Sequence, residues 1–230
     1  MITPVHFRKF FLAFLAIFAF AWIGIVVLPW MALGDLQPMP QAGSTDILPW
    51  DTTGLAHAGE KVYAANGCVY CHTQQVRDPA SGADIIRGWG TAKDEDGKAI
   101  TRRTYPRDYI WQGETFLGND RNGADLSNVG ARFKKPAQLY AWLYHPDTFN
   151  SNSSMPAYRY LFITRKISGQ PSDDALSLPP EYAPPAGFEV VPTADAKSLV
   201  AYLLSLNKGY HLKPDEAGIP YKPPTPDNKS

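Results

Sequence analysis

The sequence has only two cysteines in 230 residues, and both fall within one five-residue stretch. A structural zinc site generally needs four cysteine or histidine ligands in two pairs, so this chain has too few cysteines for one of the usual kind. It also lacks the βαβ pattern expected beside a thioredoxin-like Cys-x-x-Cys motif. Because 22 basic residues balance 22 acidic ones, nothing in the charge indicates a nucleic-acid partner.

The two cysteines belong to the run Cys68-Val69-Tyr70-Cys71-His72, which is typical of a c-type haem attachment site. Two thiols separated by two residues can span the two vinyl groups of one porphyrin, and the next residue presents an imidazole to the iron from the same side. We therefore predict one haem c, bound covalently by Cys68 and Cys71, with His72 as an axial iron ligand. A short disulfide is the alternative, because the compartment inferred below is oxidising.

One long run of residues carries no charge, the 25 residues from Phe10 to Gly34. A helix needs about 20 residues to cross a bilayer, so this run predicts a transmembrane anchor. Arg8 and Lys9 precede the run and the next lysine after it is Lys61. The positive-inside rule then puts the N-terminus in the cytoplasm and the rest of the chain outside. A cleaved signal peptide is the alternative, and it would export the same domain, but its apolar core is usually only about 7–15 residues long.

Hydrophobic periodicity predicts helices over 53–67, 136–145 and 193–209. The first helix leads directly into the cysteine motif, and the last has an apolar stripe that includes Leu199, Val200 and Leu203. We expect four parts in the chain: the N-terminus and anchor (1–34), a tether punctuated by proline and glycine (35–52), a haem domain (53–211) and an extended or disordered tail (212–230).

A single methionine, Met155, follows the cysteine motif, and it lies in a polar loop directly before a proline. Methionine usually fills cores, so a loop methionine in this setting is expected to be the second axial ligand of the haem iron. His145 and His211 are the rival ligands. His145 stands before a proline at a helix end and His211 lies beyond the last helix, so both are interpreted as ordinary polar residues.

Together these motifs resemble the monohaem cytochrome c subunit, subunit II, of cbb3-type cytochrome c oxidases, over roughly residues 10–163. The matching segments are Gly67 to Arg77 (GCVYCHTQQVR), Gly123 to Leu126 (GADL) and Ser154 to Tyr158 (SMPAY).

In that family a proline stands in the position of Ala124, and its carbonyl accepts the proton of the proximal imidazole. A backbone carbonyl does not depend on the side chain, so the bond can survive the change to alanine. The resemblance thus implies that Ala124, with Leu126 and Arg121, lies in the haem surroundings.

The resemblance implies a mostly α fold, with a single N-terminal transmembrane helix followed by a cytochrome c-like haem domain with long loops. There the helix over 53–67 crosses the C-terminal helix near Tyr202. It also implies a non-catalytic subunit that relays single electrons to a haem–copper catalytic subunit, which reduces oxygen to water. Its partners would be that subunit, a further cytochrome c subunit and the lipid bilayer of a bacterial inner membrane, with the haem domain on the periplasmic face.

Three alternatives stay open at this point. The chain could be the cytochrome c subunit of a nitric oxide reductase, a haem-free membrane-anchored thiol or metal module, or a free-standing anchored electron shuttle.

Overall fold

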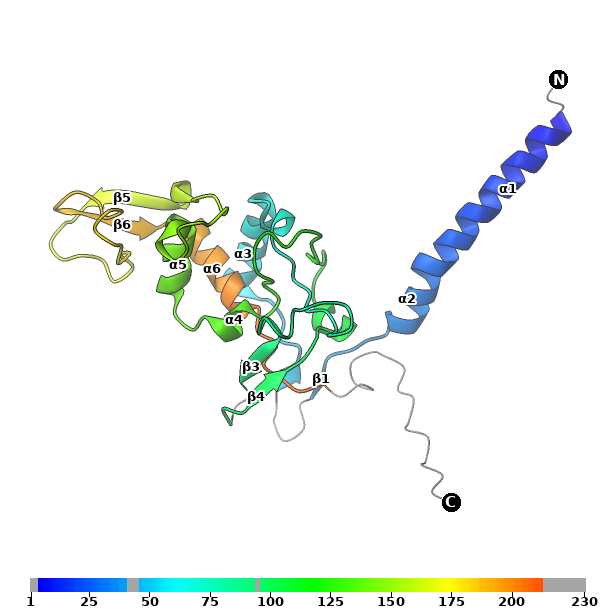
Figure 1. Ribbon diagram of the computed structural model, residues 1–230, viewed down its shortest axis with the longest axis horizontal. Helices are drawn as coiled ribbons and strands as arrows, with labels where there is room; N and C mark the ends of the chain where they lie inside the picture. The colour runs from blue at the N-terminus through cyan, green and yellow to red at the C-terminus, as the bar shows by residue number, and fades with distance from the viewer. Residues whose placement is uncertain (1–3, 41–45, 94–95, 213–230) are drawn as a thin grey trace, which may run out of the picture. The chain divides into compact units, whose positions relative to one another are not determined.

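The computed structural model describes residues 4–40, 46–93 and 96–212 (Figure 1). Contacts divide the chain into two compact units. One comprises Met1–Met39, Tyr105–Ile110 and Leu212–Ser230, and the other comprises Pro40–Thr104 and Trp111–His211. Most of the predicted tail lies outside the described residues.

The N-terminal helix runs through α1 (Pro4–Trp22), a π-helical turn η1 (Ile23–Val27) and α2 (Leu28–Leu33). The stretch Pro4–Leu33 is long and apolar enough to cross a membrane, which is consistent with the predicted anchor. Pro29 lies in the first turn of α2. Proline has no N–H to donate and its ring clashes with the carbonyl four residues earlier, here within the π turn. The wider turn accommodates this break in the hydrogen-bond ladder.

In the second unit, α3 (Gly54–Ala65) packs against α6 (Ala194–Ser205), as the sequence predicts. Gly59 lies where the helices meet, because a Cβ built there would be 1.8 Å from the Ser198 carbonyl oxygen. The rings of Tyr63 and Tyr202 lie 5.3 Å apart beside this contact. A small residue therefore lets the backbones approach, and aromatic side chains fill the space next to it.

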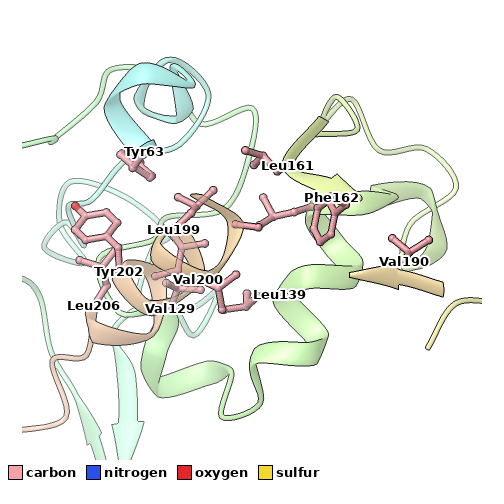
Figure 2. Close-up of a cluster of buried hydrophobic side chains, with 13 residues drawn as sticks. Tyr63, Val129, Leu139, Leu161, Phe162, Val190, Leu199, Val200, Tyr202 and Leu206 are labelled. Atoms are coloured by element: carbon pink, nitrogen blue, oxygen red, sulfur yellow. The ribbon is translucent and has the colours of Figure 1, made fainter. Parts of the chain in front are cut away.

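The core of this unit gathers side chains from α3, α4 (Val129–Arg132), α5 (Pro136–Tyr144) and α6, as Figure 2 shows. The predicted helix at 136–145 is confirmed as α5. The prediction that the last helix runs to Gly209 is wrong, because α6 ends at Ser205. Leu206 leaves the helical conformation, and its carbonyl accepts the N–H of Gly130 at 2.8 Å. A tertiary contact therefore ends α6.

Strands are few, which confirms a mostly α class, and they occur where the sequence predicts only loops. β3 (Thr91–Lys93) pairs antiparallel with β4 (Ala99–Thr101), and β5 (Phe162–Lys166) pairs with β6 (Phe188–Pro192). The other strands are β1 (Met39–Pro40) and β2 (Ile47–Leu48). Val190 and Val191 of β6 are buried, so this end of the proline-rich segment belongs to the interior rather than to a surface wrap.

The remaining helical elements are short 3-10 turns: η2 (Cys68–Tyr70), η3 (Pro106–Tyr109), η4 (Pro146–Thr148) and η5 (Arg159–Leu161). The first of them holds the cysteine motif.

Candidate haem site

The cysteine motif forms one tight turn at the end of α3. Gly67 has a φ of +67°, a left-handed conformation that favours glycine and redirects the chain into η2. The N–H of His72 then donates to the Cys68 carbonyl at 3.0 Å. Cys68 is half-buried, Cys71 is exposed, and both thiols are free. The structure thus brings two cysteine side chains and an imidazole together within a single turn.

The His72 ring is oriented by the loop that the sequence singles out. Its Nδ1 lies 2.7 Å from the Ala124 carbonyl oxygen. Because a carbonyl can only accept, Nδ1 carries the proton and Nε2 keeps its lone pair. A Cβ at Gly123 would lie 2.2 Å from the His72 Cε1, so only glycine fits against this face of the ring. This is how proteins fix a metal-binding histidine, through a hydrogen bond from the nitrogen that does not ligate.

The loop over 117–126 runs alongside the residues of the motif through three backbone hydrogen bonds. They join Gln74 to Leu117 at 3.0 Å, Gly123 to Cys71 at 2.9 Å and Leu126 to Thr73 at 2.8 Å. Leu126 also packs against the core cluster. The structure therefore places both Ala124 and Leu126 beside the motif.

Asp125 is not among the residues that the sequence predicts for the site, and it is fully buried in this loop. Its carboxylate accepts hydrogen bonds from the Thr73 hydroxyl, the Gln75 N–H and both the N–H and hydroxyl of Ser127, at 2.5 to 2.9 Å. The sequence signal is its place in the segment Gly123 to Leu126, which matches the family; nothing local reveals the two donors some fifty residues away.

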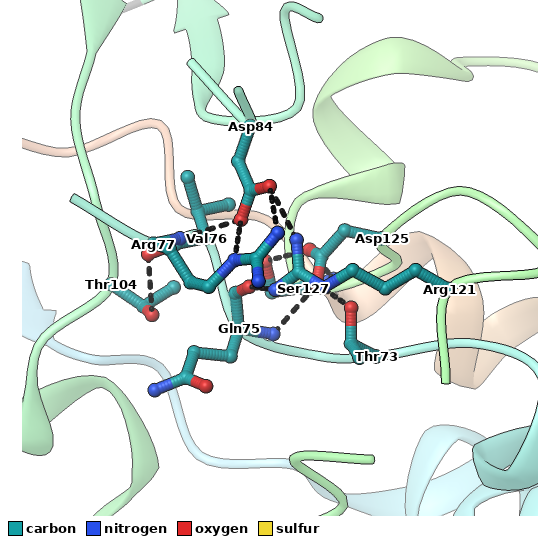
Figure 3. A network of polar contacts seen from close by, with 9 residues as sticks. All are labelled: Thr73, Gln75, Val76, Arg77, Asp84, Thr104, Arg121, Asp125 and Ser127. Carbon is teal, nitrogen blue, oxygen red and sulfur yellow. Dashed lines mark hydrogen bonds and ion pairs between the residues drawn. The ribbon is translucent and has the colours of Figure 1, made fainter. Parts of the chain in front are cut away.

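Arg121 belongs to a second polar network, centred on the buried carboxylate of Asp84 (Figure 3). Asp84 pairs with Arg121 and accepts three hydrogen bonds from Arg77, from its backbone N–H at 2.8 Å, Nε at 3.2 Å and Nη2 at 3.1 Å. Burial favours the neutral acid, but the hydrogen bonds from both arginines outweigh it, so the pKa of Asp84 is lowered. Arg121 also donates to the Gln75 carbonyl at 2.7 Å. It therefore fastens the loop to the residues that follow the motif.

The segment that carries Met155 lies beside the cysteine turn. Met155 is half-buried and packs against the core cluster, as does Cys68. The Tyr160 hydroxyl hydrogen-bonds Asn66, two residues before Cys68. Burial, with a smaller contribution from the nearby Cys68, raises the pKa of Tyr158 to about 12. These contacts bring the predicted second ligand to the same part of the molecule as His72.

The two rival ligands are placed differently. His145 is buried with its ring stacked on Tyr182, their centroids 3.4 Å apart. His211 is exposed. Within the described residues, no three His, Cys, Asp or Glu side chains are grouped so that they could hold a metal ion. The described part of the chain therefore supplies no protein-only metal centre as an alternative.

These residues fit a c-type haem. Two free thiols share one turn, an imidazole has an oriented nitrogen available, and a thioether comes from a neighbouring segment.

Comparison with protein families matches residues 5–177 to the family described as "Cytochrome C oxidase, mono-heme subunit/FixO". The matched range includes the anchor, the cysteine turn, the 117–126 loop and Met155. No curated protein matches the chain.

Proposed function

This chain belongs to the cytochrome c oxidase mono-heme subunit/FixO family, which confirms the resemblance to the cbb3-type monohaem subunit, and from that membership we propose that it carries one covalent haem c and relays single electrons. As a subunit of an oxidase complex it takes part in electron transport. The proposed acceptor is the haem–copper catalytic subunit, where oxygen is reduced to water.

The observation that carries this proposal is the 2.7 Å contact between His72 Nδ1 and the Ala124 carbonyl. It leaves Nε2 as the ligating atom, while Cys68 and Cys71 supply the thioether links and Met155 supplies the second axial ligand. Bound haem would supply a one-electron iron couple. The protein fixes the ring of His72 and presents the sulfur of Met155, and ligation by that sulfur raises the reduction potential of the iron. The hydrophobic core covers the site.

The cysteine turn lies at the surface of the described part of the chain, with Cys71 exposed and Tyr70 76 % accessible. We propose that residues 53–211 form a cytochrome c-type domain, in which α3 and α6 are the crossing helices, and that a partner approaches the exposed side of this turn.

The anchor suggests where the complex lies. We propose that Pro4–Leu33 spans a bacterial inner membrane with Arg8 and Lys9 on the cytoplasmic side, so that the haem domain is periplasmic. Its partners would be the catalytic subunit, a further cytochrome c subunit and the bilayer.

Expression of the full chain with a haem-maturation system tests the proposal. We expect haem that stays attached under denaturing conditions, and a weak red absorption band from sulfur-to-ferric-iron ligation. Met155→Ala should abolish the band, whereas Met39→Ala, outside the site, should retain it. A folded, exported protein without covalent haem would overturn the proposal and leave the thiol module.

The catalytic partner needs its own experiment. Purification of the tagged chain from the native membrane should recover a haem–copper oxidase subunit. Recovery of a nitric oxide reductase subunit, or of no large partner, would contradict the proposed acceptor.

A further inference from the structure

We propose that Asp125 is a positioning residue for the axial imidazole, whose buried carboxylate holds the Ala124 carbonyl on His72 and whose charge lowers the reduction potential of the centre. This inference rests on the proposed function, because it takes His72 as an iron ligand. It extends that function by assigning the tuning of the potential to a particular side chain.

The carboxylate joins the two chain segments whose contact orients His72 (Figure 3). Its Oδ2 accepts the Thr73 hydroxyl at 2.6 Å and the Gln75 N–H at 2.7 Å. Thr73 directly follows His72, and Asp125 directly follows Ala124. The hydrogen bonds of Asp125 to Thr73 and Gln75 therefore fix the spacing across which the imidazole reaches the carbonyl.

The surroundings match an ionised carboxylate. Two of the four groups that face it, the N–H groups of Gln75 and Ser127, can only donate. The hydroxyls of Thr73 and Ser127 can donate as well, so an ionised carboxylate can accept from all four groups. Hydrogen bonds to an ionised acceptor are about twice as strong as neutral ones, so four of them stabilise a buried charge.

Arg132 and Arg77 lie close to this charge, and Arg77 donates to the Asp84 carboxylate. The guanidinium of Arg132 donates to the backbone carbonyls of Asp125 and Trp89, not to the carboxylate. The carboxylate is also close to the imidazole, because the Thr73 hydroxyl that it accepts at 2.6 Å belongs to the residue after His72, and Asp125 follows Ala124, whose carbonyl lies 2.7 Å from His72 Nδ1. The charges of Asp125 and Arg132 therefore act on the imidazole in opposite directions.

A negative charge at this position favours the oxidised state of the centre, which carries one more positive charge than the reduced state. The hydrogen bond that Asp125 holds in place acts in the same direction, since a stronger ligand stabilises the higher oxidation state. Loss of the charge should therefore shift the redox equilibrium about tenfold towards the reduced form, an order-of-magnitude expectation for charges in a partly buried site.

Redox titration of the haem-loaded full chain tests this inference. Asp125→Asn keeps the size of the side chain but removes its charge. In this variant the balance between oxidised and reduced haem should shift about tenfold towards the reduced form. Ser127→Ala is the matched control, because it removes a donor within the loop, keeps the Thr73 and Gln75 bonds and leaves a less neutralised carboxylate. The balance between its oxidised and reduced haem should shift the other way, towards oxidation.

A purely structural role predicts a lower melting temperature in both variants, with no difference in the sign of the redox shift, and that result would overturn the inference. If Asp125→Asn does not take up haem, the Ser127→Ala control still decides, because an unchanged potential in it would also refute the inference. A wild-type chain without covalent haem would refute the proposed function itself. A wild-type chain with haem and an unchanged Asp125→Asn potential would refute only the role of Asp125.

Discussion

Replacing Gly59 by alanine tests the contact between α3 and α6. An added Cβ would lie 1.8 Å from the Ser198 carbonyl oxygen and 2.8 Å from the Tyr202 Cβ. An ordinary contact begins near 3.4 Å, so at this point the helices must separate by roughly 1.6 Å, the difference between the two distances. Such overpacking costs about 3 kcal/mol at the upper end of its usual range.

Alanine also favours the helix over glycine by about 1 kcal/mol, which offsets part of that cost. The net loss in the free energy of unfolding is then about 2 kcal/mol. For a chain of this size each 1 kcal/mol lowers the Tm by about 2–4 °C, so we expect a fall of about 4–8 °C.

The assay is thermal unfolding of the haem-loaded chain in detergent, followed by circular dichroism. The matched control is Ala58→Gly, the reverse exchange at the adjacent exposed position of α3. It should lose only the helix-propensity difference of about 1 kcal/mol. If Gly59→Ala proves as stable as the wild type, or more stable, the close approach of the helices at Gly59 would be refuted.

Two further predictions concern the site. Gly123→Ala should push the His72 ring away from the Ala124 carbonyl, because the added Cβ would lie 2.2 Å from His72 Cε1. We therefore expect an altered haem spectrum. The control Gly113→Ala, with nothing within 4 Å of its Cβ, should leave the spectrum unchanged. Asp84→Asn should reduce the Tm at pH 7, because the folded state lowers the pKa of this carboxyl. That stabilisation is present above the unfolded pKa of about 4 and is lost as the pH falls through the folded pKa, so melts from pH 7 to pH 3 should show the two proteins converging in acid. A constant difference across this range would contradict the assignment to the Asp84 charge.

The parts of the fold that the sequence predicts well depend on local patterns. The cysteine motif fits within five residues, and the periodicity of α3 and α6 lies within each helix. The Thr193 side chain caps α6 by accepting the Ala196 N–H at 3.2 Å, a signal that can be read from adjacent residues.

The parts that the sequence leaves hidden depend on distant partners. Asp125 is 52 residues from the Thr73 hydroxyl that it accepts, so the residues around it in the sequence do not reveal this partner. Strand β6 pairs with β5 across a proline-rich connection, so its partner is not apparent from its neighbours. The end of α6 is set by Gly130, far away in the chain. For the same reason, the local pattern predicts a helix that runs on to Gly209.

The π turn between α1 and α2 has a consequence for how a neighbouring helix can pack against the N-terminal helix. Each residue advances about 100° around an α-helix, so one extra residue in a turn rotates the phase of everything beyond it by about that angle. A stripe of side chains that faces one neighbour before Ile23 therefore faces another direction after Val27. A single flat neighbour cannot follow the same side along the whole helix. Deletion of one residue within Ile23–Val27 should restore a continuous α-helix, so that the side chains before Ile23 and after Val27 that form one stripe face the same direction.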